Sequence, residues 1–162
     1  NGDYAHTICR SFLYDAWHLP LQQALAKSTD ERIAAIAGKA VKEVSYHLRT
    51  SSEWMIRFGD GTDESHQRAQ QALDALWTFT GDLFVQDDVH KQMVTAGIAP
   101  DLSPIKAAFD ATIDKVLAEA TLKRPADGFM ASGGREGKHS EHLGFLLAEM
   151  QYLQRAYPGA TW

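Results

Sequence analysis

The stretch KEVSYHLR, residues 42–49, lies in the middle of a long helical pattern and decides how the rest of the chain is interpreted. Apolar residues around it recur every three or four positions, the period of one face of an α-helix: Ile33, Ile36, Ala37, Ala40, Val44, Leu48, Met55 and Phe58. Ser28, Thr29 and Asp30 precede the pattern as a capping sequence. The stretch FGDGTD, residues 58–63, ends it with two glycines that can take left-handed conformations. We therefore expect one long helix from just after Asp30 to about Phe58.

The same period extends along nearly the whole chain. Further helices are expected over about residues 4–27, 64–84, 103–122 and 140–156, with a short helix ending near Gly97. Pro20 should bend or divide the first of them because proline removes an amide donor. Ser103 and Pro104 form a start signal, a capping hydroxyl followed by proline at the first helical position. Residues 123–138, rich in glycine and charge, are expected to be a loop. Strand signals are nearly absent, so the sequence predicts an all-α fold in one domain over residues 1–162.

Composition excludes several classes of function. The chain has 162 residues, of which 44% are hydrophobic and 23% charged, as in an ordinary globular protein. Its net charge of −5 argues against nucleic acid as a partner, since phosphate binding needs a basic surface. No apolar run approaches the roughly 20 residues that span a bilayer. A single cysteine, Cys9, fits a reducing, cytoplasmic compartment. The chain begins without methionine, and we expect it to be a trimmed or fragmented product.

Two pairs of residues have the character of metal ligands in helix bundles. Glu43 and His47 are four residues apart and share a helix face, with Lys39 one turn earlier on that face. In the first helix, Asp15 and His18 are three residues apart. Bundles that hold paired iron use Glu-x-x-His and need roughly four carboxylates and two imidazoles. This chain supplies at most two of each. His47 lies four residues after Glu43 instead of three, and Lys39 lies on the same helix face.

Two interpretations of these residues remain open. The favoured one is a metal-free, buried polar network, the remnant of a metal site, formed by Asp15, His18, Lys39, Glu43 and His47, in which the lysine ammonium balances the charge. The other is a working metal site. If the glutamate is buried with its partners, Glu43→Ala should destabilise the protein by about 3–5 kcal/mol. A loss below about half a kcal/mol would place this residue at the surface.

A second cluster lies in GREGKHSEHLG, residues 134–144. Its two histidines, His139 and His142, are three residues apart, but a zinc site would need a third and a fourth ligand from elsewhere in the chain. The favoured interpretation is the start of a helix with Ser140 as its cap and the charged residues in solvent or at a contact between subunits.

Taken together, several stretches resemble one known family: YDAWHLPL, AVKEVSYHLR, FGDGTDES, LWTFTGDLF and GKHSEHLGFLLAEMQYLQRAYPGATW. The chain resembles the structural C subunits of bacterial phenylacetyl-CoA epoxidases, the multicomponent ring-1,2-epoxidases of aerobic phenylacetate breakdown. The resemblance runs the length of the chain, is most specific over residues 139–162, and covers the later two-thirds of the family's usual length. It implies a ferritin-like helical bundle from which this chain lacks the first helical pair.

The resemblance also implies a role and partners. Such a C subunit is non-catalytic: it stabilises a related catalytic A subunit, which carries the di-iron centre, and holds no cofactor of its own. A small B subunit and a reductase that passes electrons from NADPH complete the system, and the chain's own N-terminal helical pair would complete its bundle. The family further suggests a contact with the coenzyme A part of phenylacetyl-CoA near Lys91, Gln92 and Met93.

Two other functions are weighed against this one. The first is a self-sufficient di-iron carboxylate oxygenase or oxidase of the ferritin-like class, and the second is a helical protein that binds partners for regulation. If a helical pair is missing, the apolar line through Ile33, Ile36, Ala40 and Val44 should be exposed. The isolated chain should then dissolve poorly or oligomerise.

Overall fold

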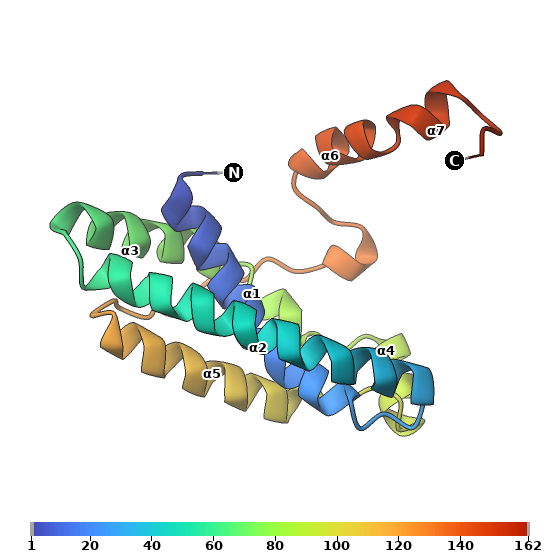
Figure 1. The fold of residues 1–162 in the computed structure, drawn as a ribbon, viewed down its shortest axis with the longest axis horizontal. Coiled ribbons are helices and arrows are strands. Elements are labelled where there is room, and N and C mark those ends of the chain that lie inside the picture. The colour runs from blue at the N-terminus through green and yellow to red at the C-terminus, as the bar shows by residue number, and fades with distance from the viewer. Residues whose placement is uncertain (1, 162) are drawn as a thin grey trace. The chain divides into compact units, whose positions relative to one another are not determined.

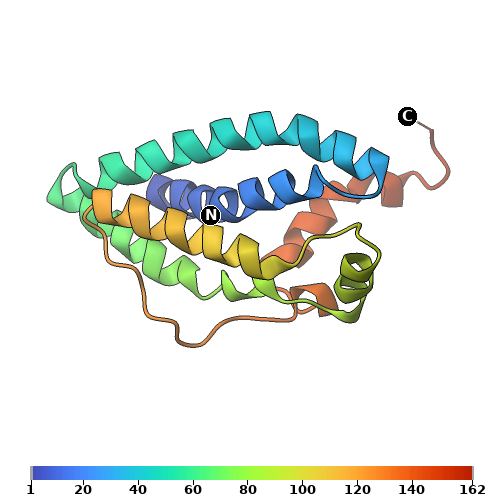
Figure 2. The same cartoon turned by 90° about the horizontal axis from the view of Figure 1, so that it is seen from below.

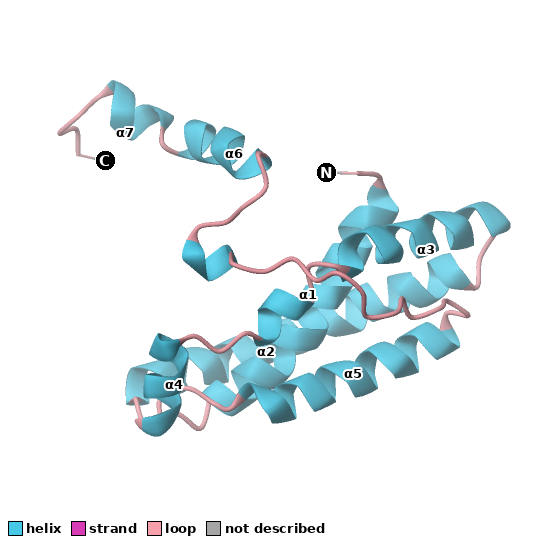
Figure 3. Ribbon diagram, turned by 180° about the vertical axis from the view of Figure 1, so that it is seen from behind, coloured by secondary structure: helices cyan, strands magenta, loops and turns pink. Residues whose placement is uncertain are grey.

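The computed structural model describes residues 2–161, which form helices and loops without a strand (Figures 1 and 3). The elements are α1 (Tyr4–Leu25), α2 (Glu31–Gly59), α3 (Asp63–Trp77), η1 (Gly81–Phe84), α4 (Asp88–Thr95), α5 (Leu102–Glu119), η2 (Gly134–Glu136), α6 (His142–Met150) and α7 (Tyr152–Ala156), where η marks a 3₁₀ helix. The all-α prediction is confirmed, and the ferritin-like bundle stays a prediction. None of the described helices is long and apolar enough to cross a membrane.

The described residues divide by their internal contacts into two compact units, one up to Ala131 and one from Ser132. In the first unit α1 contacts α2, α3 and α5, and these four helices form a bundle (Figure 2). Its largest fully buried side chains are Phe12, Phe109, Met55, Leu73, Ile113, Leu117 and Cys9. The second unit holds η2, α6 and α7, and neither α-helix contains a buried residue. The prediction of a single domain stays a prediction.

The starts of the helices follow from side-chain caps. Asp30 caps α2 as predicted, its carboxylate accepting hydrogen bonds from the backbone N–H groups of Arg32 and Ile33. The predicted cap of α5 is wrong, because Asp101 takes that place and accepts from the N–H of Ser103 at 2.6 Å. An aspartate caps a helix at least as well as a serine. Pro104 still lies in the first turn, where its missing N–H leaves no intrahelical bond unmade.

Two predicted boundaries inside or after helices are corrected. The first helix is not divided at Pro20: α1 runs through it to Leu25, because its packing against three other helices stabilises the helical backbone. A bend at Pro20 stays a prediction. The third helix ends at Trp77 instead of Phe84, where the Thr80 hydroxyl donates to the carbonyl of Trp77 at 2.8 Å.

The last predicted helix is two helices. The backbone of Gln151, with φ −98° and ψ 0°, separates α6 from α7. Ser140 is not the cap of α6. Glu141 occupies the cap position, and its side chain makes no capping hydrogen bond.

The apolar line on α2 that the sequence predicts to be exposed is exposed only in part. Ile36 lies in solvent, Ile33 and Ala40 are half-buried, and Val44 is buried. The line therefore crosses from the surface into the first unit's core instead of following one open face. Poor solubility or oligomerisation of the isolated chain stays a prediction.

The glycines of FGDGTD have a different role from the predicted one. Neither Gly59 nor Gly61 has a positive φ. Gly59 is the last residue of α2, and a Cβ built on it would collide with the backbone carbonyl and the Cβ of Ala120, just after α5. The glycine is therefore required by the close approach of two backbones.

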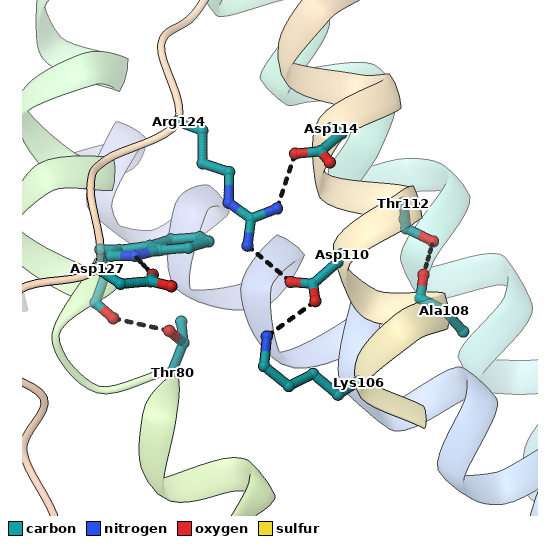
Figure 4. A network of polar contacts seen from close by, with 9 residues as sticks. Thr80, Lys106, Ala108, Asp110, Thr112, Asp114, Arg124 and Asp127 are labelled. Carbon is teal, nitrogen blue, oxygen red and sulfur yellow. Dashed lines mark hydrogen bonds and ion pairs between the residues drawn. The ribbon is translucent and has the colours of Figure 1, made fainter. Parts of the chain in front are cut away.

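A network of hydrogen bonds and ion pairs connects the loop after α5 to α3 and α5 (Figure 4). The Arg124 guanidinium donates to Asp110 at 2.7 Å and to Asp114 at 2.8 Å, both on α5. It also lies 5.0 Å from the ring centroid of Trp77 on α3. The indole N–H of Trp77 in turn donates to the Asp127 carboxylate at 3.1 Å. The loop predicted over residues 123–138 is irregular backbone except for η2, and these contacts give its first part a fixed course.

Candidate functional site

The candidate site is a groove between α1 and α2. These helices are consecutive and antiparallel, and they lie side by side (Figures 1 and 2). The groove has a volume of about 380 Å³ and is lined by Ile8, Ser11 and Asp15 from α1 and by Tyr46, His47, Thr50 and Ser51 from α2. Among residues 2–161, Asp15 is the only buried carboxyl, with 7% of its surface exposed. A buried carboxyl in an open groove is the most unusual chemical feature of the first unit.

Asp15 has few partners for a buried carboxylate. The Ser51 hydroxyl donates to its Oδ2 at 2.9 Å. That hydroxyl also lies 3.0 Å from the carbonyl oxygen of His47, and its one proton serves one acceptor at a time. Across the part of the chain that the structure describes, Asp15 has no ion pair with lysine or arginine. A carboxylate accepts about four hydrogen bonds, so most of this capacity is unused.

Burial makes a charge on Asp15 or on His18 less favourable than it would be in water. Burial raises the pKa of the Asp15 carboxyl, and the hydrogen bond from Ser51 and the imidazoles of His47 and His18 offset this only in part. Burial lowers the pKa of His18, as His47 also does, against the opposite effect of Asp15. The Nε2 of His18 lies 2.9 Å from the Gln22 side-chain amide, a suitable acceptor for the amide N–H when the imidazole is neutral.

The same turn of α1 carries a second unsatisfied group. The ring of Tyr14 lies tilted against its two neighbours, with centroids 4.9 Å apart for Tyr14 and His18 and 5.4 Å apart for Tyr14 and Trp17. The indole N–H of Trp17 is buried and has no hydrogen-bond partner among the described residues. Buried donors without acceptors are rare in complete folds. Trp17 therefore holds an unused donor, two positions along α1 from the under-used acceptor of Asp15.

The remaining residues of the predicted network lie further out on α2. Lys39, Glu43 and His47 are exposed. The buried residues of α2 form a separate seam: Ala37, Val44, Ser51, Met55 and Gly59. Lys39, Glu43 and His47 lie outside this seam. Asp15, His18 and His47 are close enough to interact electrostatically. The network of five residues stays a prediction.

The exposure of Glu43 gives its substitution a definite expected result. Glu43→Ala should change the free energy of unfolding of this chain by less than about 0.5 kcal/mol, because an exposed side chain with no ion pair among the described residues contributes little. Urea denaturation of both proteins measures it. A loss of about 3–5 kcal/mol would instead mean that the glutamate is buried and paired in solution.

The described residues do not fit a di-iron centre. Such a centre needs roughly four carboxylates and two imidazoles directed at one point. Within residues 2–161, no group of three or more histidine, cysteine, aspartate or glutamate side chains is placed to hold a metal ion. This holds for the groove and also for the second cluster, in which His139 and His142 are both exposed. The part of the chain that the structure describes therefore does not bring together the ligand set of a paired-iron site.

The predicted coenzyme A contact lies on α4, away from the groove residues in sequence. Lys91 and Gln92 are exposed and Met93 is half-buried. The Lys91 ammonium forms an ion pair with Asp88 at 3.2 Å, and both side chains are largely in solvent. A solvated ion pair of this kind is weak. The contact with coenzyme A stays a prediction.

Sequence reasoning missed Ser51, which lines the groove, and the unsatisfied indole N–H of Trp17 on α1. Ser51 continues the buried seam of Ala37 and Val44 at a spacing of seven residues, and that spacing was a usable signal. Its partner Asp15 is 36 residues away, on another helix. The unsatisfied indole N–H of Trp17 depends on its surroundings in three dimensions, and no sequence pattern indicates it.

Replacing the buried carboxyl should stabilise the chain at neutral pH. Burial raises the pKa of Asp15 in the folded state, so the folded protein favours the protonated form. The carboxyl's favourable contribution is present below its unfolded pKa, about 4, and is lost as the pH rises through the folded pKa. Asp15→Asn, which cannot ionise, should therefore raise the free energy of unfolding at pH 7 by on the order of 1 kcal/mol.

Urea denaturation at pH 7 and pH 3.5 measures this effect. The gain should disappear at pH 3.5, where both proteins carry an uncharged group at this position. Glu43→Gln serves as the matched control, because it removes an exposed carboxyl on α2 and should change stability at neither pH. A loss of stability at pH 7 in Asp15→Asn would show instead that the carboxylate is well paired in solution.

The chain has relatives among known proteins over its whole length. The profile of the phenylacetic acid catabolic protein family matches residues 1–162. The chain is 47% identical, over all of its 162 residues, to the C subunit of the 1,2-phenylacetyl-CoA epoxidase of Escherichia coli (strain K12). It spans 65% of the length of that protein, just under two thirds.

Proposed function

Because the chain belongs to the phenylacetic acid catabolic protein family, we propose that it acts as a structural C subunit of a phenylacetyl-CoA epoxidase. The observation that carries the proposal is the 47% identity to the C subunit of the Escherichia coli enzyme, which extends over every part of the chain. An identity of this size over the whole chain supports a fold shared with that subunit.

The proposed role is to stabilise a related catalytic A subunit that carries the di-iron centre. The residues at the positions that resemble metal ligands favour a structural role over a catalytic one. Asp15 is the single buried carboxyl of the described residues and is bonded to a serine, and Lys39 places a cation in the line of Glu43. The substrate would be phenylacetyl-CoA, bound mainly by the catalytic subunit, with Lys91, Gln92 and Met93 of this chain near its coenzyme A part. A small B subunit would complete the assembly.

Reconstitution tests this proposal. The protein that carries this chain is mixed with a catalytic A subunit and the reductase, and epoxidation of phenylacetyl-CoA is followed with NADPH as the electron source. We expect activity with both subunits, little with the A subunit alone and none with this protein alone. The melting temperature of the A subunit should rise when this protein is added, since binding to the folded state stabilises it.

Two outcomes would contradict the proposal. Epoxidation by this protein and the reductase without the A subunit would establish a self-sufficient oxygenase. An unchanged melting temperature of the A subunit at saturating amounts of this protein would exclude a stabilising role.

A further inference from the structure

We propose that residues 122–131 form a strap that opens and closes over the first unit while the helical bundle stays folded, and that the ion pairs of Arg124 are the latch that holds the strap shut. The strap follows α5 and ends at the last residue of the first unit. It goes beyond the proposed function, because it concerns contacts within this chain and involves no other subunit.

The first support is that the strap buries few of its own side chains. Of its residues only Leu122 is buried, and Met130, near the other end, is half-buried against the core. Residues 126–129 between them are exposed. Segments with few buried apolar contacts open locally at a lower free energy than the core does. The strap can therefore leave the bundle while the core stays packed.

The second support is that polar contacts fix the strap at both ends. On α3, the Gln70 side-chain oxygen accepts from the N–H of Lys123 at 2.8 Å. Just after α3, the Thr78 hydroxyl donates to the carbonyl of Phe129 at 2.8 Å, and the N–H of Ala131 donates to the Thr78 carbonyl at 2.8 Å. These hydrogen bonds are remote in sequence, so they define a closed position without requiring a buried apolar face.

The third support is the position of Arg124 between the strap and α5 (Figure 4). Its guanidinium pairs with Asp110 at 2.7 Å and with Asp114 at 2.8 Å, and it lies 5.0 Å from the centroid of the Trp77 ring. The Arg124 side chain is 29% exposed, so water and salt reach it. Partly exposed ion pairs are screened by salt, and they hold a segment reversibly.

The open state leaves no isolated charge behind. Lys106 also pairs with Asp110, at 2.8 Å, so this carboxylate keeps a cation when Arg124 leaves. Asp114 is largely exposed and is solvated in the open state. Opening therefore exchanges the Arg124 ion pairs for contacts with water and avoids burying an unpaired charge.

The strap covers an aromatic cavity of about 160 Å³. The bundle side of this cavity includes Trp77, Phe84 and Phe109, and the strap side is formed by Arg124, Asp127 and Met130. Trp77 is only 3% exposed in the closed position. Its indole N–H donates to Asp127, which leaves with the strap. Opening would therefore uncover the Trp77 ring and expose its indole N–H to water.

Hydrogen exchange followed by NMR tests the proposal on the protein that carries this chain. The strap is reported by the backbone N–H groups of Lys123 and Ala131 and by the indole N–H of Trp77. The core is reported by the backbone N–H groups of Phe12 on α1 and Ile113 on α5. Exchange is measured at pH 7, at low salt and at about 1 M KCl, where screening is nearly complete.

Two variants separate the latch from a general effect of charge. Arg124→Gln removes the latch. Lys115→Gln is the matched control, because it removes a positive charge from α5 that is exposed and has no ion pair among residues 2–161.

We expect the strap groups of the unmodified protein to exchange at least about tenfold faster than the core groups. Arg124→Gln should accelerate the strap groups, including the Trp77 indole, by about tenfold more, and the core groups by less than about twofold. High salt should accelerate the strap of the unmodified protein and have little effect in Arg124→Gln. Lys115→Gln should behave like the unmodified protein.

Three results would each overturn the proposal. Equal acceleration of strap and core would show that the strap opens only when the bundle unfolds. A strap rate that Arg124→Gln leaves unchanged, or that Lys115→Gln raises equally, would show that the ion pairs are not the latch. A Trp77 indole that exchanges at the rate of the core would show that the strap does not cover it. No epoxidase subunit is present, so the result is independent of the reconstitution described above.

Discussion

Phe109→Ala is expected to lower the free energy of unfolding by about 3–5 kcal/mol, the range for removing a large aromatic side chain from a packed core. Phe109 lies on α5, is 1% exposed, and has ring contacts with Phe84 at 5.2 Å and with Trp77 at 6.3 Å. Truncation would leave a cavity where α5, the end of α3 and η1 meet. It would also remove the packing that supports the polar network on Trp77.

Urea denaturation followed by tryptophan fluorescence measures this loss. The control is Phe129→Ala in the loop after α5, where the side chain is 86% exposed and its removal should change stability by no more than about 0.5 kcal/mol. Similar losses in the two variants would contradict the described core, because they would place both rings in equivalent surroundings.

Gly59→Ala is expected to destabilise the protein by about 2–3 kcal/mol, at the upper end of what one added methyl group does in a well-packed region. The new Cβ would meet the carbonyl and the Cβ of Ala120, so relief requires a backbone shift at the end of α2 or after α5. A backbone carbonyl cannot rotate away as the end of a side chain can.

Gly38→Ala is the matched control, in the interior of the same helix. A Cβ at Gly38 would have no neighbour within 4 Å. The substitution should therefore stabilise the protein by about 0.5–1 kcal/mol through helix propensity alone. Thermal unfolding of the two variants should thus give shifts of opposite sign. A stabilising Gly59→Ala would show that α2 and the end of α5 do not approach as closely as described.

The long helix α2 shows how far the sequence alone could predict the fold. Its start at Asp30, its end near Phe58 and its apolar period were all readable, because caps and periodicity are local. The reason for Gly59 was not readable, because it depends on Ala120, 61 residues away. Whether Pro20 bends or divides α1 could not be decided from the sequence either, because tertiary packing can outweigh a local propensity, and the structure shows no division there.

The candidate site was predictable in part. The sequence identified Asp15, His18 and His47, which the structure brings into electrostatic contact. It grouped them with Lys39 and Glu43 because spacing indicates a shared helix face. Spacing does not tell whether that face is directed toward the neighbouring helices or toward solvent. In the structure the buried face of α2 passes through Val44 and Ser51 instead. Ser51, the actual partner of Asp15, carries no charge and matched no metal-ligand pattern.

The location of the iron decides whether this protein is a structural subunit that supports a di-iron partner. The protein that carries this chain is loaded with Fe(II) anaerobically, alone and together with a catalytic A subunit, then desalted and analysed for iron in each chain. We expect a stable complex in which the iron belongs to the A subunit, and less than about a tenth of an iron per chain in this protein alone. About two irons per chain in this protein alone, the stoichiometry of a paired-metal bundle, would contradict it.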